Sequence, residues 1–326
     1  MPGLTAAQRE RFDRDGYLVV ENVIDVETYL DPMVADYTRR LDEVADALFA
    51  AGELTSTYAD LGFAERLIAV YADAGRDLAR YFDFSLPLRA DIKPDEPCFF
   101  GPSIFNVLRN PAVLDVIESL IGGEIYSNPV QHVRLKPPER LLRKKSVGGM
   151  VAATPWHQDA SVVVEDADET EIITVWVPVT DATEENGCLA VVPRNHEAGL
   201  LEHCPAVPGV SAKYLSTKFF DADRALPVPM KRGSALFMNK MTPHCSLPNV
   251  SDHMRWSMDL RYNPSGQPTG RPEFPGFVAR SRRYPSAELT DAAQWRDRWL
   301  DTRARISADP TLVSRFRREF SGAGCA

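Results

Sequence analysis

A chain of 326 residues is long enough to bury a sizeable core, and it exceeds the usual length of one domain. Its composition, 44% hydrophobic and 25% charged, is that of an ordinary globular protein. The formal net charge of −9 argues against a dedicated nucleic-acid binder, which would show a strongly basic balance.

The first third of the chain is predicted to be mainly helical, apart from one strand at 17–20. Apolar residues at helical spacing, with turn residues between the runs, predict helices at roughly 5–15, 26–50, 63–82 and 111–122. Thr5 and Gln8 form a capping-box pattern at the start of the first helix, and Pro111 occupies a favoured first helical position in the last. These helices carry no obvious chemistry, so we expect them to buttress a sheet.

From residue 124 onward, short β-branched and aromatic runs alternate with turn residues. The runs predict strands at 126–135, 161–164, 172–179, 189–192, 235–238 and 256–262. Several short strands at this spacing are typical of a sandwich or jelly roll. Segments 137–155 and 264–285 are rich in Pro, Gly, Arg and Lys, and we expect them to be long loops, where function often concentrates.

The chain shows no internal repeat, so a single elaborated domain is the leading interpretation of residues 1–326. Its expected parts are a helical buttress, a β core and a C-terminal extension of loop and helix, at 1–123, 124–263 and 264–326. No apolar run approaches the ~18 residues of a membrane span, and the first residues show no signal-peptide pattern. We therefore expect no membrane partner.

The cysteines are odd in number and scattered, without a Cys-x-x-Cys pair, at Cys98, Cys188, Cys204, Cys245 and Cys325. This usage suits reduced thiols better than a disulfide framework. Reduced cysteines and a cytoplasmic location are the expectation.

A histidine and an aspartate stand two positions apart at the head of an apolar run, His157 and Asp159. Residues i and i+2 of a strand point to the same face, so both side chains can converge on one metal ion. His244, which follows a strand-like run, is the best candidate for a third ligand. Two histidines and one carboxylate on one side of a metal are typical of non-haem Fe(II) oxygenases. A lone His-x-Asp arises often by chance, and the same ligands could hold zinc in a hydrolase.

Further motifs accompany these residues along the chain, in the order Phe12 to Val20, Leu135-Lys136-Pro137-Pro138, His157-Gln158-Asp159, Trp176, Asn186-Gly187-Cys188-Leu189, His244-Cys245-Ser246 and Arg255. Together they resemble the phytanoyl-CoA dioxygenase family, a branch of the Fe(II)- and 2-oxoglutarate-dependent oxygenases. The chain departs from the family at 193–196, where Pro-Arg-Asn-His replaces Pro-Gly-Ser-His, which concerns a local turn. The resemblance implies a double-stranded β-helix, a cupin-like jelly roll with the metal at its mouth and helices beside it.

The resemblance also implies roles for residues beyond the three ligands. In the family an arginine shortly after the distal histidine binds the second carboxylate of 2-oxoglutarate, and Arg255 matches that spacing. A guanidinium offers a bidentate, always charged grip on a carboxylate. Ser246 and Trp176 match positions that contact the same ligand, and His132 falls on another contact position. From the residues alone, Arg255 could instead form a surface ion pair, and Trp176 could be a core side chain.

The chemistry that the resemblance implies uses Fe(II), 2-oxoglutarate and O2. It is the hydroxylation, or a related oxidation, of an unactivated C–H bond in a small or medium-sized metabolite, with release of succinate and CO2. Asp159 favours this over halogenation, because a Gly or Ala there would free a site for halide. The rival interpretation is a jelly-roll metal-dependent hydrolase or isomerase that does not use 2-oxoglutarate. The sequence leaves the substrate and the oligomeric state open.

Overall fold

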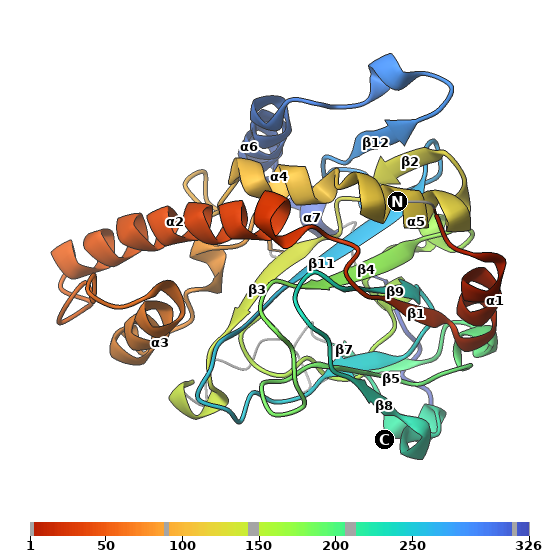
Figure 1. The fold of residues 1–326 in the computed structure, drawn as a ribbon, viewed down its shortest axis with the longest axis horizontal. Coiled ribbons are helices and arrows are strands. Elements are labelled where there is room, and N and C mark those ends of the chain that lie inside the picture. The colour runs from red at the N-terminus through yellow and green to blue at the C-terminus, as the bar shows by residue number, and fades with distance from the viewer. Residues whose placement is uncertain (1–2, 88–90, 143–149, 206–212, 315–317, 326) are drawn as a thin grey trace.

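The computed structural model describes the chain apart from residues 1–2, 88–90, 143–149, 206–212, 315–317 and 326. The fold is mainly β with flanking helices (Figure 1), which confirms the predicted fold class. The helices are α1 (Ala6–Asp15), α2 (Asp31–Ala50), α3 (Phe63–Ala74), α4 (Pro102–Leu108), α5 (Pro111–Ile121), α6 (Ala292–Ala308) and α7 (Thr311–Ser314). The strands are β1 (Tyr17–Val20), β2 (Glu124–Ser127), β3 (His132–Lys136), β4 (Ile173–Pro178), β5 (Leu189–Val191), β6 (His203–Pro205), β7 (Lys213–Leu215), β8 (Leu226–Val228), β9 (Ala235–Asn239), β10 (His244–Ser246), β11 (Arg255–Pro264) and β12 (Phe277–Ser281).

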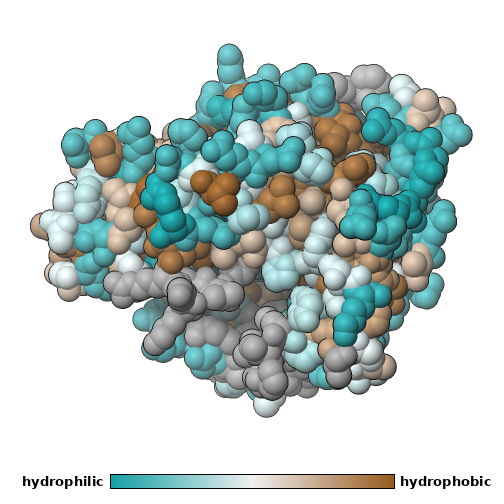
Figure 2. Space-filling model, turned by 90° about the horizontal axis from the view of Figure 1, so that it is seen from below, coloured by the Kyte–Doolittle hydropathy of each residue, from teal (hydrophilic) through white to brown (hydrophobic). Residues whose placement is uncertain are grey.

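The larger sheet has seven strands and is antiparallel throughout, in the order β1-β9-β4-β11-β2-β12, with β3 pairing the first half of β11. A smaller sheet has the order β10-β5-β8, and β6 pairs with β7. In Figure 1, α2, α4 and α5 lie above β3, β4, β9 and β1, and β5 and β8 lie below these strands, whereas β2 and β12 reach above α5. The central strands of the larger sheet therefore form a layer between these helices and the smaller sheet. Figure 2 shows the molecule from below, where hydrophilic and hydrophobic residues are mixed over the surface.

Strand β11 separates the apolar and polar sides of the larger sheet. Its even-numbered residues pack toward the helices, as Trp256 does with its ring centroid 4.7 Å from that of Tyr37 on α2 and 5.2 Å from that of Phe63 on α3. Arg255, Asp259 and Arg261, which alternate with them, line a pocket between the two sheets, and Ser257 lies between Arg255 and Asp259 on the same face. Strict alternation along one strand thus gives the larger sheet an apolar face and a polar face.

The N-terminal helices agree in part with the predictions. The capping box at the start of α1 is present, since Thr5 accepts from the Gln8 N–H and the Gln8 side chain accepts from the Thr5 N–H. The helix predicted at 26–50 begins with one π-helical turn, Val26–Leu30. The helix predicted at 63–82 ends at Ala74, because Gly75 adopts a left-handed conformation with φ 59° and caps it.

Three predictions for the second half are wrong. The run predicted as one strand at 126–135 is divided between β2 and β3, with residues 128–131 outside both. Residues 161–164 are not a strand, because a 3-10 turn over Asp159–Val162 occupies the start of this run. The segment predicted as a loop at 264–285 contains β12, in which Phe277 and Ala279 are buried in alternation. Its Pro- and Gly-rich flanks hid this short strand from the sequence pattern. Residues 143–149 of the other predicted loop lie outside the described residues.

The expectation of five reduced cysteines is also wrong in the structure. Cys204 on β6 and Cys325 near the C-terminus form a disulfide, whereas the other three are free. The two are 121 positions apart, so no local spacing could show the pairing. The cytoplasmic location stays a prediction and loses its argument from the cysteines. In the part of the chain that the structure describes, no helix has the length and apolar character needed to span a membrane.

Candidate metal centre

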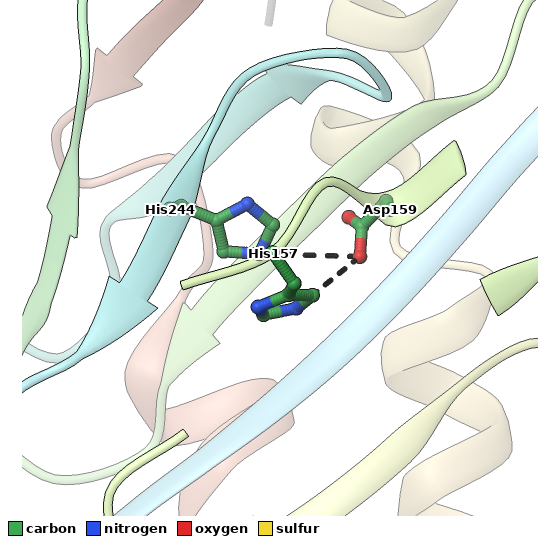
Figure 3. A group of neighbouring side chains, drawn as sticks. All are labelled: His157, Asp159 and His244. Carbon is green, nitrogen blue, oxygen red and sulfur yellow. Dashed lines mark ion pairs between the residues drawn. The ribbon is translucent and has the colours of Figure 1, made fainter. Parts of the chain in front are cut away.

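The three predicted ligands meet at one end of the space between the sheets (Figure 3). His244 opens β10 and forms an antiparallel bridge with His157, whose N–H donates to the His244 carbonyl at 2.9 Å. Asp159 follows at the start of a 3-10 turn. Asp159 Oδ1 lies 3.8 Å from His157 Nε2 and 3.9 Å from His244 Nε2. Among the described residues, no other group of three such side chains is close enough to share a metal.

Backbone carbonyls orient both imidazoles. His157 Nδ1 lies 2.9 Å from the Pro155 carbonyl, and His244 Nδ1 lies 3.0 Å from the Thr242 carbonyl. A carbonyl can only accept, so each Nδ1 carries the proton and each Nε2 presents a lone pair. Metal-binding histidines are commonly held in this way. Both free lone pairs belong to the nitrogens that face Asp159.

The protonation states suit metal binding at neutral pH. Burial, with help from nearby His244, lowers the pKa of His157 to about 3. Burial opposes charge on Asp159, but the Arg261 guanidinium and the two imidazoles hold the pKa of this carboxyl well below its usual range. Arg261 and the Thr174 hydroxyl both donate to Asp159. A neutral imidazole and an ionised carboxylate are the forms that bind metals.

The donor set fits iron(II). Two imidazole nitrogens and one carboxylate oxygen, all within 4.8 Å of one another, match the 2-His-1-carboxylate arrangement with open positions on the far side. His157 and His244 line one pocket, so the open metal positions would face that pocket. The lining of this pocket also includes Trp176, Ser246 and Arg255. These three residues, which the sequence analysis predicted to lie beside the metal, are therefore close to the candidate ligands.

Arg255 is almost completely buried, with 1% of its surface exposed. Its Nε donates to the Gly187 carbonyl at 3.1 Å, and its Nη1 donates to the Ser257 hydroxyl. The guanidinium carbon lies 5.5 Å from the centroid of the Trp176 ring. These contacts leave Nη2 without an acceptor among the described residues, and they exclude a surface ion pair as the reason for Arg255. Burial lowers the pKa of Arg255 to about 10, so the side chain still carries its charge at neutral pH.

His132 occupies a different setting from the other predicted residues. It lies opposite Asp259 on the polar face of the larger sheet, but it does not line the pocket. Its Nδ1 lies 2.8 Å from the buried carboxylate of Asp83, which also accepts from the Val133 N–H. Burial opposes charge on Asp83, yet His132 and Arg80 lower the pKa of this carboxyl. A contact between His132 and a co-substrate stays a prediction.

Sequence reasoning missed three residues that shape this site. Arg261 and Thr174 hold Asp159, and Lys136 donates to the hydroxyl of Ser246. Alternation along β11 contained the signal for Arg261, because residues 255, 257, 259 and 261 share one face. The contact made by Lys136 had no such signal, because it depends on which strands pair.

Known proteins resemble this chain over the region that contains the candidate site. The profile of a family described as phytanoyl-CoA dioxygenase (PhyH) matches residues 12–257. A probable phytanoyl-CoA dioxygenase of Caenorhabditis elegans is 25% identical over 267 residues, which are 79% of this chain and 75% of that protein. A methylphosphonate hydroxylase of Gimesia maris is 32% identical over 152 residues, 47% of this chain and 53% of its own. A 1-deoxypentalenic acid 11-beta-hydroxylase of Streptomyces exfoliatus is 28% identical over 174 residues, 50% of this chain and 57% of its own.

Among solved structures, the non-haem monooxygenase ThoJ has the same fold. Its metal-free form superposes with a TM-score of 0.56 at 19% identity, over 95% of this chain and 100% of that one. At this identity the likeness concerns the fold alone.

Proposed function

We propose that this chain, which belongs to the phytanoyl-CoA dioxygenase family of non-haem iron(II)- and 2-oxoglutarate-dependent oxygenases, oxidises an unactivated C–H bond. The proposed substrate is a small or medium-sized metabolite. We assign His157, Asp159 and His244 as the iron ligands. The observation that carries this assignment is the convergence of their three ligand atoms, with both imidazole lone pairs directed to one side of Asp159.

Iron held by these three residues would supply the oxidising chemistry, in which 2-oxoglutarate, O2 and the substrate give succinate, CO2 and the oxidised substrate. The protein contributes orientation and shielding. Carbonyl contacts keep the imidazoles in one tautomer, and Arg261 with Thr174 keeps the Asp159 carboxylate in place. Asp159 and His244 are buried, which limits the access of bulk water to the reacting groups.

Arg255 is assigned to the second carboxylate of 2-oxoglutarate. Its Nη2 is the part of the guanidinium with donors still available, and its other contacts prevent it from turning away. The Ser246 hydroxyl lines the same pocket and is assigned to the same carboxylate, and Trp176 stacks beside the guanidinium. A buried guanidinium in the pocket lining favours a dianionic co-substrate over a neutral one.

The substrate itself is not determined by family membership. Two relatives are named as hydroxylases of quite different molecules, a methylphosphonate and a deoxypentalenic acid, and this chain covers only about half of each. A fold and family of this kind support many substrates. We propose a metabolite, with a preference for specialised metabolism, because the Streptomyces relative is named as a hydroxylase of 1-deoxypentalenic acid.

The decisive experiment is an anaerobic titration of the purified protein with Fe(II) and then 2-oxoglutarate. We expect the weak visible charge-transfer band of iron-bound 2-oxoglutarate, which disappears in His157→Ala and weakens strongly in Arg255→Ala. The matched control is His253→Ala, which removes an exposed histidine and should leave the band unchanged. Iron binding without any band would favour the hydrolase or isomerase interpretation. Loss of the band in the control as well would mean that the variants act through folding.

A further inference from the structure

A second buried cation stands directly opposite Arg255. The register of β3 and β11 pairs Lys136 with Arg255, and the two side chains are 2% and 1% exposed. Neither forms an ion pair with a carboxylate of the described chain. Of the acidic residues that act on Lys136, Asp259 is ion-paired with Arg134, and Glu139 accepts from the Ala153 N–H. Burial and the charge of Arg255 lower the pKa of Lys136 well below its usual range, as expected where a counter-charge is missing. Like charges on directly opposed residues destabilise a sheet, and a buried charge without a partner costs stability. Stability of the fold therefore does not explain why Lys136 and Arg255 are both buried and directly opposed.

The hydrogen bonds of Lys136 determine what the Ser246 hydroxyl can do. The ammonium group has three N–H bonds, and it donates them to the Ala152 carbonyl, Thr154 Oγ1 and Ser246 Oγ. Ser246 Oγ accepts a second hydrogen bond, at 2.7 Å, from the Thr154 N–H. With both lone pairs of its oxygen occupied, the Ser246 hydroxyl can only donate.

The donor that Lys136 creates has no acceptor in the described chain. Ser246 lines the pocket and donates to no described residue, and Arg255 lines the same pocket with its Nη2 unused. Lys136 itself does not line the pocket, so it lies behind the wall. Two donors, the Ser246 hydroxyl and Arg255 Nη2, therefore line one pocket, and the Lys136 ammonium lies behind Ser246. Such a group of donors is the complement of a carboxylate.

We propose that Lys136 is a positioning residue for the distal carboxylate of the co-substrate: it holds the Ser246 hydroxyl as an obligate donor and, together with Arg255, supplies the positive charge that this carboxylate neutralises. The inference rests on the proposed use of 2-oxoglutarate and adds a residue that reaches the ligand through another side chain. It also explains why two opposed cations are tolerated, since the bound dianion provides the missing counter-charge.

A merely structural role must be separated from this one. Lys136 also holds Ala152 and Thr154, which lead into the metal motif. Loss of that support would weaken every ligand of the pocket to a similar extent. Loss of a charge and a fixed donor would weaken only ligands that carry the distal carboxylate. The useful comparison is between 2-oxoglutarate and 2-oxopentanoate, which has a methyl group in place of that carboxylate.

The experiment measures the Kd of both ligands by anaerobic titration of the iron-loaded protein, in the wild type and in Lys136→Met. We expect the preference of the wild type for 2-oxoglutarate over 2-oxopentanoate to fall by about tenfold to a hundredfold in the variant, the range for a hydrogen bond to a charged group. The Kd of 2-oxopentanoate and the affinity for iron should change little. In Ser246→Ala, the further effect of Lys136→Met on this preference should be smaller than in the wild type, because the two act in sequence.

Lys240→Met is the matched control. Lys240 is also buried, and its ammonium donates to the carbonyls of Ala167, Asp168 and Thr170, but it does not line the pocket. It should lower stability without changing the preference between the two ligands. If Lys136→Met does not fold, Lys136→Gln, which keeps donors but no charge, serves in its place and should show the same selective loss.

The outcomes separate the two proposals. If the wild type shows no 2-oxoglutarate band, the proposed function fails and this inference fails with it. A wild-type band together with an unchanged preference in the Lys136 variants overturns the inference alone. A parallel loss for both ligands also overturns it, and assigns Lys136 to the support of residues 152–154.

Discussion

Asp159 is a buried carboxylate whose negative charge can be balanced by protein side chains or by a bound metal ion. In the structure it accepts from Arg261 and from Thr174, and the two imidazoles face its Oδ1 atom. A metal ion at the same oxygen would provide a second positive partner. Removing one member of a buried ion pair is strongly destabilising, because it leaves the other charge without compensation. The contribution of Arg261 to the free energy of unfolding should therefore be smaller when metal is bound.

We predict that Arg261→Met lowers the free energy of unfolding by about 3–5 kcal/mol in the metal-free protein, and by clearly less when Mn(II) is saturating. The metal compensates the charge of Asp159 in the folded state only. Denaturant unfolding with and without metal measures both values. Arg66→Met is the control, because Arg66 is buried in α3 and bonds Asp42. Arg66→Met should lower the free energy of unfolding by the same amount with and without metal. If Arg261→Met also lowered it equally in the two conditions, the prediction would be contradicted.

At the scale of elements, one turn connects the fold to the pocket. Asn186 and Gly187 lead into β5, where Asn186 Oδ1 accepts from the Thr183 N–H at 2.8 Å. Gly187 has φ 92°, and a Cβ there would lie 2.5 Å from the carbonyl oxygen of Leu247. Its own carbonyl accepts from Arg255. The turn therefore holds the guanidinium in place and tolerates no side chain.

Gly187→Ala should lower stability by several kcal/mol, because it combines an unfavourable backbone conformation, about 1–3 kcal/mol, with a backbone clash. It should also raise the Kd of 2-oxoglutarate, because the acceptor of Arg255 moves. Gly266→Ala is a matched control: Gly266 has φ 89° but no atom within 4 Å of a Cβ. It should show the conformational cost alone. Thermal unfolding measures the stability of the two variants, and titration measures their Kd for 2-oxoglutarate. If both variants lost the same stability and kept the same Kd, the predicted clash at Gly187 would be contradicted.

At the scale of the whole molecule, the three expected segments share one sheet and one core. Strand β1 comes from the N-terminal segment and β12 from the C-terminal one, and both join the sheet formed by the central segment. One apolar cluster reaches from Phe12 to Val313. The disulfide links Cys325 to β6, and the centroid of the Phe320 ring lies 5.0 Å from that of the His203 ring. We therefore propose that residues 1–326 form a single domain.

We predict that Cys325→Ser lowers the free energy of unfolding by about 2–5 kcal/mol, because the unfolded chain is no longer closed into a long loop. Cys98→Ser, which removes a free and only partly buried thiol, should change it far less. Thiol counting under denaturing conditions provides an independent check. Three of the five cysteines should react before reduction and all five after it. Five reactive thiols without reduction would instead support the reduced state that the sequence suggested.

The amino-acid sequence alone determined what depends on neighbouring residues. The capping box of α1 and most strands of the β core follow from short-range patterns, because side-chain alternation and helix caps act within a few residues. The family motifs, the metal-ligand candidates and Arg255 were also visible in order along the chain. The 3-10 turn at Asp159 and the short strands β6, β7, β8, β10 and β12 were missed, because tertiary contacts override weak local preference.

Only the tertiary structure decided which distant side chains meet. The register of β3 and β11 placed Lys136 against Arg255, two residues 119 positions apart by their numbers. The folding of the chain brought Arg261 to Asp159 and Cys325 to Cys204. A one-residue change of register would turn Lys136 away from Ser246, and nothing in its local sequence prevents that. The sequence therefore showed the candidate groups for iron and 2-oxoglutarate, and strand pairing decided which charges and hydrogen-bond partners lie beside them.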